Sequence, residues 1–336
     1  MNTHRRATLQ DIADQLGITK MTVSRYLRDP DKVAEKTRLR IAKAIEESGY
    51  IQNRVPAMLS KASSKAIGIV VPSLSNQVFA ELVQGVESVT RARGYSTLIA
   101  HTGYDPGTEE EKVAVLLSYQ VDALILTQTE HTERTRKMLS TAGLPVAETM
   151  ELPATPIDIA VGLDHAAAAC EATQRMITAG KKRIVYLAAR LDTRTLLRQQ
   201  GYEQAMKQAL LTPLTVSTPA HSSFTTGTSL MQEAITTYPD IDGVFCTNDD
   251  LAVGVMLFCI GQGKSVPEDV AVVGYNGLDV GQAMQPALTS VLTPRYHIGE
   301  KSADMLIRRI NGETQVAKRV NVGFSFTDGV TDGLQR

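Results

Sequence analysis

Cysteines and long apolar segments are scarce in this sequence of 336 residues. The three cysteines, Cys170, Cys246 and Cys259, share no spacing typical of metal ligands, and their odd number argues against a disulfide framework. We therefore expect them to be packing residues in a reducing cytoplasm. No run of 18 apolar residues occurs, which excludes a membrane span of the usual length.

A secretion signal is missing as well. The N-terminus, MNTHRRATLQDIADQLG, leads from two arginines directly into an amphipathic pattern, without the apolar core of a signal peptide. This start predicts a cytoplasmic protein without a membrane partner.

The sequence also lacks the motifs of common enzyme classes. It has no Gly-rich phosphate loop followed by Lys-Ser or Lys-Thr, no HExxH, no cysteine pair and no GxSxG turn. We therefore predict that the protein is not an enzyme and uses neither a metal nor another cofactor.

Charge is unevenly distributed, although the net charge at pH 7 is only −1. Residues 1–61 hold 12 Lys and Arg against 7 Asp and Glu, a surplus of +5, whereas residues 62–336 hold 23 against 29, or −6. A basic head therefore precedes an acidic body, which favours nucleic-acid binding by the head.

Three short helices are predicted in the basic head. Thr8 and Asp11 form a capping box before an i, i+3, i+4, i+7 apolar stripe that ends at the next glycine. Thr19 caps a second helix, and a third covers about residues 34–48. Three helices joined by tight turns indicate a helix-turn-helix domain at residues 1–50, whose second helix enters the major groove of DNA.

The second helix has two different faces. Its apolar side chains fall on one side, and the other side carries Lys20, Met21, Ser24 and Arg25. We predict that Lys20, Met21 and Arg25 contact bases, with Arg25 recognising a guanine edge. The hydroxyl groups expected to bind phosphates are those of Thr8, Thr19, Thr22 and Ser24. The alternative is a solvated basic face without a role in DNA binding.

Residues 51–65, IQNRVPAMLSKASSK, link the head to the body. Pro56 can open a helix of barely two turns, which is too short to be stable alone in water. We expect it to order against DNA or a partner chain, with Leu59 as a minor-groove wedge and with Asn53 and Arg54 as further DNA contacts. The alternative is an ordinary linker.

The body, residues 66–336, alternates apolar runs with helical stretches. The runs that predict buried parallel strands are AIGIVVP, STLIAH, DALILT, LPVAE, IDIAVG, RIVYLA, GVFCTN and VAVVGY. Helices are expected at about residues 77–93, 109–119, 166–179, 195–209, 226–237 and 250–261. This alternation predicts an α/β protein with doubly wound parallel sheets, in two lobes around a cleft.

Six segments form an ordered series along the chain: TLQDIADQLGITKMTVSRYL, GYIQNR, IGIVVPSLSNQVFAEL, VFCTNDDLAVGVM, VVGYNGLD and LTSVLTP. Together they resemble the LacI/GalR family of bacterial transcription repressors over essentially the whole chain. The segments TKMTVSRYL, NQVFAEL, DGVFCTNDDLAVG and SVLTPR are most similar to the subgroup of gluconate- and idonate-utilisation repressors.

The resemblance implies a hinge helix after the head and a body with the fold of periplasmic binding proteins. The chain would cross between the lobes near residues 161–163, 291–294 and 318–320. The N-lobe would comprise about residues 66–160 and 295–318, and the C-lobe about residues 164–290 and 320–336. The family further implies a homodimer on a palindromic operator, with Leu59 at its centre, and a small effector in the cleft.

The resemblance also assigns residues to that cleft. Phe79 follows the family's N-lobe pocket segment, and Arg198, three residues before a glycine, matches an arginine that binds a sugar hydroxyl or carboxylate. Asn248 in TNDD and Asn276 in GYNG match two polar strand-end positions of the C-lobe.

Two positions depart from the family pattern. Gln52 stands where the family usually has proline, and Asn276 where it has aspartate. Loss of that carboxylate removes like-charge repulsion, which favours an anionic ligand. We therefore predict a sugar acid such as gluconate, bound through charge-assisted hydrogen bonds by Arg198 and Arg194.

Simpler alternatives exist for these assignments. Asn248 and Asp249 could cap a helix that starts at Asp250, and capping is our prediction for Asp249. Arg198 could form a surface ion pair, and Phe79 could be a core residue. For the whole protein, the rival class is a cytoplasmic sugar-binding protein without sequence-selective DNA binding.

Overall fold

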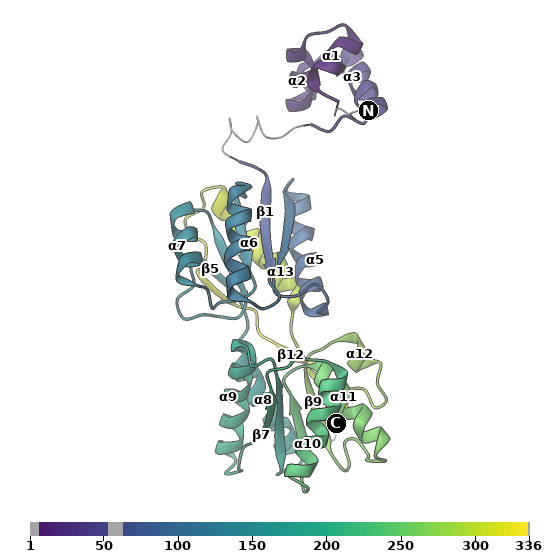
Figure 1. Cartoon of the computed structure of the whole chain (residues 1–336), viewed down its shortest axis with the longest axis vertical. Helices are drawn as coiled ribbons and strands as arrows, with labels where there is room; N and C mark the ends of the chain where they lie inside the picture. The colour runs from purple at the N-terminus through teal and green to yellow at the C-terminus, as the bar shows by residue number, and fades with distance from the viewer. Residues whose placement is uncertain (1–6, 53–62, 335–336) are drawn as a thin grey trace. The chain divides into compact units, whose positions relative to one another are not determined.

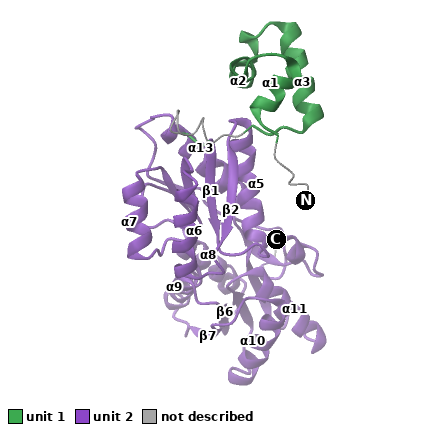
Figure 2. Cartoon of the chain, turned by 45° about the horizontal axis from the view of Figure 1, so that its top comes forward, with its two compact units in different colours: residues 1–64 green, residues 65–336 purple. Residues whose placement is uncertain are grey.

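The computed structural model describes residues 7–52 and 63–334. The predicted DNA contacts Asn53, Arg54 and Leu59 lie outside the described residues. The chain divides into two compact units, residues 1–64 and residues 65–336 (Figure 2). Each unit has a hydrophobic core of its own.

The first unit is a helical domain. Its elements are α1 (Leu9–Leu16), α2 (Lys20–Arg28), the 3₁₀ turn η1 (Pro30–Lys32) and α3 (Glu35–Ser48). The predicted capping box is confirmed, because the Asp11 N–H donates to Thr8 Oγ1 (3.3 Å) and the Thr8 N–H donates to Asp11 Oδ2 (2.7 Å). Gly17, at φ 64°, ends α1, and the Thr19 side chain caps α2 as predicted.

The apolar faces of the three helices meet in one small core, formed by Ile12, Ala13, Val23, Ile41, Ala44 and Tyr50. Tyr26 and Leu27 pack against it, as the helical spacing predicts. Burial of this face turns the other side of α2 outward.

The second unit contains two six-stranded sheets, with strand orders β11-β5-β4-β3-β1-β2 and β12-β10-β9-β8-β6-β7. The strands of the first sheet are β1 (Ala66–Val71), β2 (Ser96–His101), β3 (Ala123–Leu126), β4 (Val146–Met150), β5 (Ile159–Gly162) and β11 (Arg319–Asn321). Those of the second are β6 (Ile184–Ala189), β7 (Leu214–Thr218), β8 (Gly243–Cys246), β9 (Ala271–Asn276), β10 (Thr289–Leu292) and β12 (Ser325–Phe326). Among the strands of the described residues, only β10 and β12 pair antiparallel, so the predicted parallel α/β fold is confirmed.

Helices cover both faces of each sheet (Figure 1). The first sheet is flanked by α5 (Gln77–Ala92), α13 (Arg295–Ile310), α6 (Pro106–Ser118) and α7 (Glu133–Ala142). The second is flanked by α8 (His165–Thr178), α9 (Thr193–Gln208), α10 (Phe224–Thr237) and α11 (Asp249–Gly261), with the short α12 (Asp279–Gln282) beside α11. We call the first sheet with its helices the N-lobe and the second with its helices the C-lobe.

The chain passes between the lobes three times, after β5, after β10 and after β11. The third passage follows Asn321, slightly later than residues 318–320, because Arg319–Asn321 still pairs with β5 of the N-lobe. The carboxyl ends of the central parallel strands of both sheets face the region between the lobes, where α/β proteins bind ligands.

Two glycines set the distance between α5 and α13. A Cβ atom on Gly85 would lie 2.0 Å from the Tyr296 carbonyl oxygen, and one on Gly299 would lie 2.1 Å from the Leu82 carbonyl oxygen. The backbones of the two helices therefore touch directly, and α13 is fixed against the helix that begins at the cleft.

Candidate functional site

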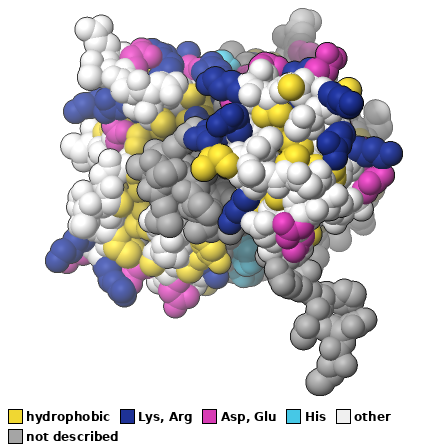
Figure 3. Space-filling model, turned by 90° about the horizontal axis from the view of Figure 1, so that it is seen from above, with side chains coloured by type: hydrophobic (Ala, Val, Ile, Leu, Met, Phe, Trp, Pro, Cys, Tyr) yellow, Lys and Arg dark blue, Asp and Glu magenta, His cyan; other side chains and the backbone are white. Residues whose placement is uncertain are grey.

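The outward face of α2 carries the residues predicted to read DNA. Lys20 and Arg25 are exposed, and Met21 is 64% exposed, which is unusual for a large apolar side chain. No ion pair in the described part of the chain includes Lys20 or Arg25. Figure 3 shows Lys and Arg side chains next to apolar and uncharged atoms on the surface. The residues available for DNA contact are therefore those on the exposed face of α2.

Three of the four predicted phosphate-binding hydroxyls, those of Thr8, Thr19 and Thr22, also take part in the helix caps. Thr8 Oγ1 donates to Asp11 Oδ2 at 2.7 Å, and the hydroxyls of Thr19 and Thr22 lie 3.0 Å apart. These contacts fix the first turn of each helix, where backbone N–H groups face outward.

The five predicted effector residues line one pocket between the lobes, with a cavity volume of about 40 Å³. Its lining comprises Asn76, Val78, Phe79, Tyr104, Met150, Ala189, Arg190, Asp192, Arg194, Thr195, Arg198, Asn248 and Asn276. The structure thus brings together residues from both lobes that are far apart in the sequence.

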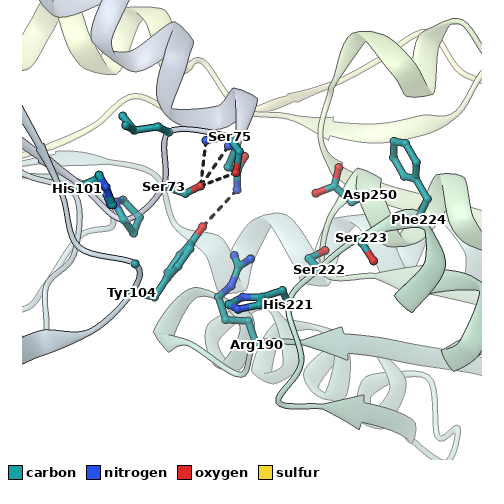
Figure 4. Close-up of a pocket in the computed structure, with 14 residues that line it drawn as sticks. Ser73, Ser75, His101, Tyr104, Arg190, His221, Ser222, Ser223, Phe224 and Asp250 are labelled. Carbon is teal, nitrogen blue, oxygen red and sulfur yellow. Dashed lines mark hydrogen bonds between the residues drawn. The ribbon is translucent and has the colours of Figure 1, made fainter. Parts of the chain in front are cut away.

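A larger cavity of about 690 Å³ adjoins this inner pocket and shares Asn76, Tyr104 and Arg190 with it. Polar groups from both lobes line this outer cavity, among them Ser73, Ser75, His101, His221, Ser222, Ser223 and Asp250 (Figure 4). Together the two spaces can hold a small polar ligand of several carbons.

Backbone strain is concentrated at the inner pocket. Four of its non-glycine residues have positive φ angles: Tyr104 (68°), Met150 (78°), Arg190 (69°) and Asn276 (109°). Such conformations cost on the order of 1–3 kcal/mol each and are typical of ligand-binding sites.

Arg198, on α9, is buried, and its surroundings leave one donor unused. Its guanidinium lies 3.7 Å from the centre of the Tyr275 ring, and Nη1 donates to the Thr247 carbonyl oxygen at 2.5 Å. Its Nε has no hydrogen-bond partner, and no ion pair among the described residues includes Arg198. Although burial opposes it, Arg194 and Arg198 lower the pKa of Asp192, which lines the same pocket. Because Arg198 forms no ion pair among the described residues, its guanidinium can still bind an anion.

A neutral histidine, His165, orients the Tyr275 ring that stacks on Arg198. Burial, with Arg198 and Arg194 nearby, lowers the pKa of His165 well below its usual value. Its Nε2 lies 3.0 Å from the Met150 carbonyl oxygen, which can only accept, so the neutral ring donates there. Nδ1 therefore accepts from the Tyr275 hydroxyl at 2.8 Å, which orients the ring beneath Arg198.

Arg194 lines the same pocket, but its charge is already balanced. Its Nε lies 3.4 Å from Glu151 Oε1, and its Nη1 donates to the Thr127 carbonyl oxygen at 3.2 Å. Burial raises the pKa of Glu151, and Arg194 opposes that rise. These contacts connect the C-lobe to the N-lobe.

The structure corrects the capping role predicted for Asp249. The helix begins at Asp249 itself, and Asn248 caps it by accepting from the Leu251 N–H at 3.2 Å. Asp249 is fully buried and accepts instead from the Leu278 N–H (2.5 Å) and Ser290 Oγ (2.6 Å), which ties α11 to β10. Burial raises its pKa to about 7.

Asn276 is connected to the N-lobe through a residue that the sequence did not reveal. The Arg295 Nη1 donates to the Asn276 carbonyl oxygen, while its Nη2 and Nε bind Glu81 on α5 at 2.8 and 3.1 Å. Arg295 is only 2% exposed. It joins the strained end of β9 to the two packed helices of the N-lobe.

Tyr104 and Arg190 are further pocket residues that the sequence analysis missed. Each follows a strand, β2 or β6, at the edge where ligands bind, and this position was the only available signal. Tyr104 and Arg190 are too far apart in the sequence for any local pattern to predict their contact across the lobes.

A buried ionic cluster lies apart from the cleft, in the N-lobe. His131 Nδ1 lies 2.5 Å from Glu109 Oε1, and Nε2 lies 3.5 Å from Glu148 Oε1. Although burial opposes protonation, the two carboxylates raise the pKa of His131 to about 9. Glu148 also accepts from the Ile157 N–H at 2.6 Å, so the cluster connects α6, β4 and the loop before α7.

The three cysteines are buried and unpaired, as expected for packing residues. Within residues 7–52 and 63–334, no group of three or more His, Cys, Asp and Glu side chains could hold a metal ion. In that same part of the chain, no helix has the length and apolar character needed to cross a membrane.

Comparison with known proteins gives matches over both units. The protein-family model described as bacterial regulatory proteins, lacI family, matches residues 8–53. The model described as periplasmic binding proteins and sugar binding domain of LacI family matches residues 64–328.

Two curated relatives and one solved structure match nearly the whole chain. The HTH-type transcriptional regulator GntR of Escherichia coli K12 is 50% identical over 97% of this chain and 98% of its own. IdnR of the same strain is 45% identical over 98% and 100%. The crystal structure of a LacI-family regulator from Silicibacter pomeroyi has a TM-score of 0.91 at 29% identity, covering 97% of this chain and 99% of its own.

Proposed function

This chain belongs to the LacI family of bacterial regulatory proteins, and from that premise we propose that it is a cytoplasmic repressor controlled by a sugar acid such as gluconate. It would bind a palindromic operator as a homodimer. DNA binding is assigned to residues 1–50, a hinge helix to residues 51–65, and effector binding and dimerisation to residues 66–336.

The head supports the DNA-binding part of the proposal. The caps fix α2 so that Lys20, Met21 and Arg25 are exposed on one helical face, which suits insertion into the major groove. Arg25 is the residue assigned to a guanine edge, because the guanidinium fork matches its two acceptors. Thr8, Thr19, Thr22 and Ser24 would position the head on phosphates.

Exposed apolar side chains support a homodimer. Leu98 and Ile99, 37% and 47% exposed, lie on β2 at the edge of the first sheet, and Leu257 and Ile260, 47% and 60% exposed, lie on α11. Exposed edge strands and apolar groups of this kind favour pairing with another chain.

The unpartnered Nε of buried Arg198 is the observation that carries the effector assignment. It lies in a pocket where Phe79 offers an apolar face, Asn248 and Asn276 offer polar groups, and Arg194 is already neutralised. A single carboxylate with adjacent hydroxyls, the chemistry of an aldonic acid, matches this set.

Control of DNA binding would follow from two states of the body. A ligand that holds the lobes together alters the N-lobes of the dimer and, through them, the spacing of the two heads. Effector and operator must then change each other's affinity by the same factor.

Selection of binding sites from randomised duplex DNA tests the DNA-binding part. The purified protein should enrich a palindrome, and Arg25→Ala should lose about 1–3 kcal/mol of discrimination at one base pair of each half-site. A uniform loss on all sequences would make Arg25 a phosphate contact. Absence of any enriched sequence would favour the rival function, a sugar-binding protein without selective DNA binding.

A further inference from the structure

Arg190 occupies the junction between the inner pocket and the outer cavity. It follows β6 at φ 69°, and its backbone N–H donates to the carbonyl oxygens of Thr218 (3.1 Å) and Ala220 (3.0 Å). The backbone is therefore fixed in an unfavourable conformation that directs this side chain to the cleft.

The Arg190 guanidinium is held by the opposite lobe. It lies 3.9 Å from the centre of the Tyr104 ring, and the Tyr104 hydroxyl accepts from Asn76 Nδ2 at 3.4 Å. Figure 4 shows the Arg190 side chain rising beside Tyr104 into the cavity. Stacking of this kind restricts the plane of a guanidinium and leaves the N–H groups at its edge available.

Those N–H groups are not fully used. Arg190 Nε is buried without a hydrogen-bond partner, as is Arg198 Nε, and neither arginine takes part in an ion pair within residues 7–52 and 63–334. Asp250 also lines the outer cavity. Burial raises its pKa and the charge of Arg190 opposes that rise, although the two residues form no ion pair in the described part of the chain. The inner pocket therefore contains two guanidinium groups, each stacked on a tyrosine, that form no ion pair among the described residues.

We propose that Arg190 is a second anion-binding residue of the effector site, whose guanidinium donates to the ligand carboxylate while it remains stacked on Tyr104. The inference rests on the proposed sugar-acid function and narrows it. The inner pocket of about 40 Å³ accommodates a carboxylate and little more, whereas the cavity of about 690 Å³ accommodates a polyol chain beside Ser73, Ser75, Ser222 and Ser223. The ligand class is a linear aldonate with its acid group inward.

Calorimetric titration of the full chain with gluconate and with glucitol tests this assignment, because the two ligands share a carbon chain and differ in the acid group. Arg190→Gln should weaken gluconate binding about 10- to 100-fold and glucitol binding less than about twofold, since only the acid uses the lost charged donor. Arg190→Lys should give an intermediate value, because it retains the charge and loses the fork.

Arg183→Gln is the matched control. Arg183 also has an unpartnered Nε, but it precedes β6 at the other end of the strand and binds Asp240 at 2.9 Å. Binding of both ligands should be unchanged in this variant. Thermal unfolding without ligand verifies that each variant is folded.

Two results would overturn the role of Arg190 and leave the proposed sugar-acid function standing. Equal weakening of gluconate and glucitol in Arg190→Gln would make the arginine a purely structural link between the lobes. Unchanged gluconate binding in Arg190→Gln, with loss in Arg198→Gln, would leave the sugar-acid function intact without Arg190. Failure of the unmodified protein to bind gluconate or any other linear aldonate would overturn the effector class and the inference together.

Discussion

Arg198 depends on a series of buried contacts. The Met150 carbonyl fixes the tautomer of His165, His165 orients the Tyr275 hydroxyl, and the Tyr275 ring lies under the guanidinium. Because the guanidinium cannot rotate freely, little conformational entropy is lost when an anion binds.

Arg198→Gln should therefore weaken gluconate binding about 10- to 100-fold, because a charge-assisted hydrogen bond is lost from a buried site. Stability should fall by only about 1 kcal/mol, since the Thr247 carbonyl oxygen loses its donor. Titration calorimetry and urea unfolding measure the two effects. Gluconate affinity equal to that of the unmodified protein would remove Arg198 from the effector site.

The buried cluster around His131 predicts a pH dependence of stability. Its pKa rises from 6.5 to about 9 on folding, so the cluster stabilises the protein fully below pH 6.5 and loses this contribution as pH rises through about 9. Relative to His131→Gln, the unfolding free energy should fall by up to about 3 kcal/mol between these pH values. Chemical denaturation of both proteins across this range isolates the contribution, and parallel curves would contradict it.

Much of the site was predicted from the resemblance to the family, which assigned Phe79, Arg198, Asn248 and Asn276 to the cleft. Arg194 was added as a second cationic partner for an acid, and all five residues line one pocket. Roles that depend on a partner distant in the sequence were not predictable. Arg190 needs Tyr104, and Arg295 needs Glu81, and no local pattern links the members of either pair.

Among the elements, the eight apolar runs and six predicted helices all correspond to observed strands and helices. The elements that were not predicted are β7, β10, α7, α12, α13, β11 and β12, and some of them have weak patterns. Helix α7, ERTRKMLSTA, is mostly polar, and β11 and β12 are short and incompletely buried, so their sequences carry little periodic signal. Their positions are set by packing against the rest of the body.

The direct contact between α5 and α13 predicts sensitivity to a single methyl group. Gly85→Ala should destabilise the protein by about 1–3 kcal/mol, because the added Cβ would collide with backbone that cannot move without separating the helices. Gly261→Ala is the control, since a Cβ there meets nothing within 4 Å. Urea unfolding of both variants measures the difference, and equal midpoints would refute the close-packing argument.

At the scale of the whole molecule, the proposed homodimer predicts which surfaces join two chains. Ile99→Asp and Ile260→Asp should each shift the protein toward monomer and weaken operator binding at least about tenfold, because a charge would be buried at the interface. Leu210→Asp is the control, because Leu210 is 95% exposed and belongs to neither apolar group. Sedimentation velocity gives the oligomeric state. A dimer that persists in both interface variants would place the interface elsewhere.

The central claim is that one ligand in the cleft controls the affinity of the head for DNA. Its most direct test is fluorescence anisotropy of the selected operator with the full chain, at several salt concentrations, with and without gluconate. We predict that gluconate changes operator affinity at least about fivefold, and that operator DNA changes gluconate affinity by the same factor. Selective operator binding that no sugar acid alters would contradict the claim.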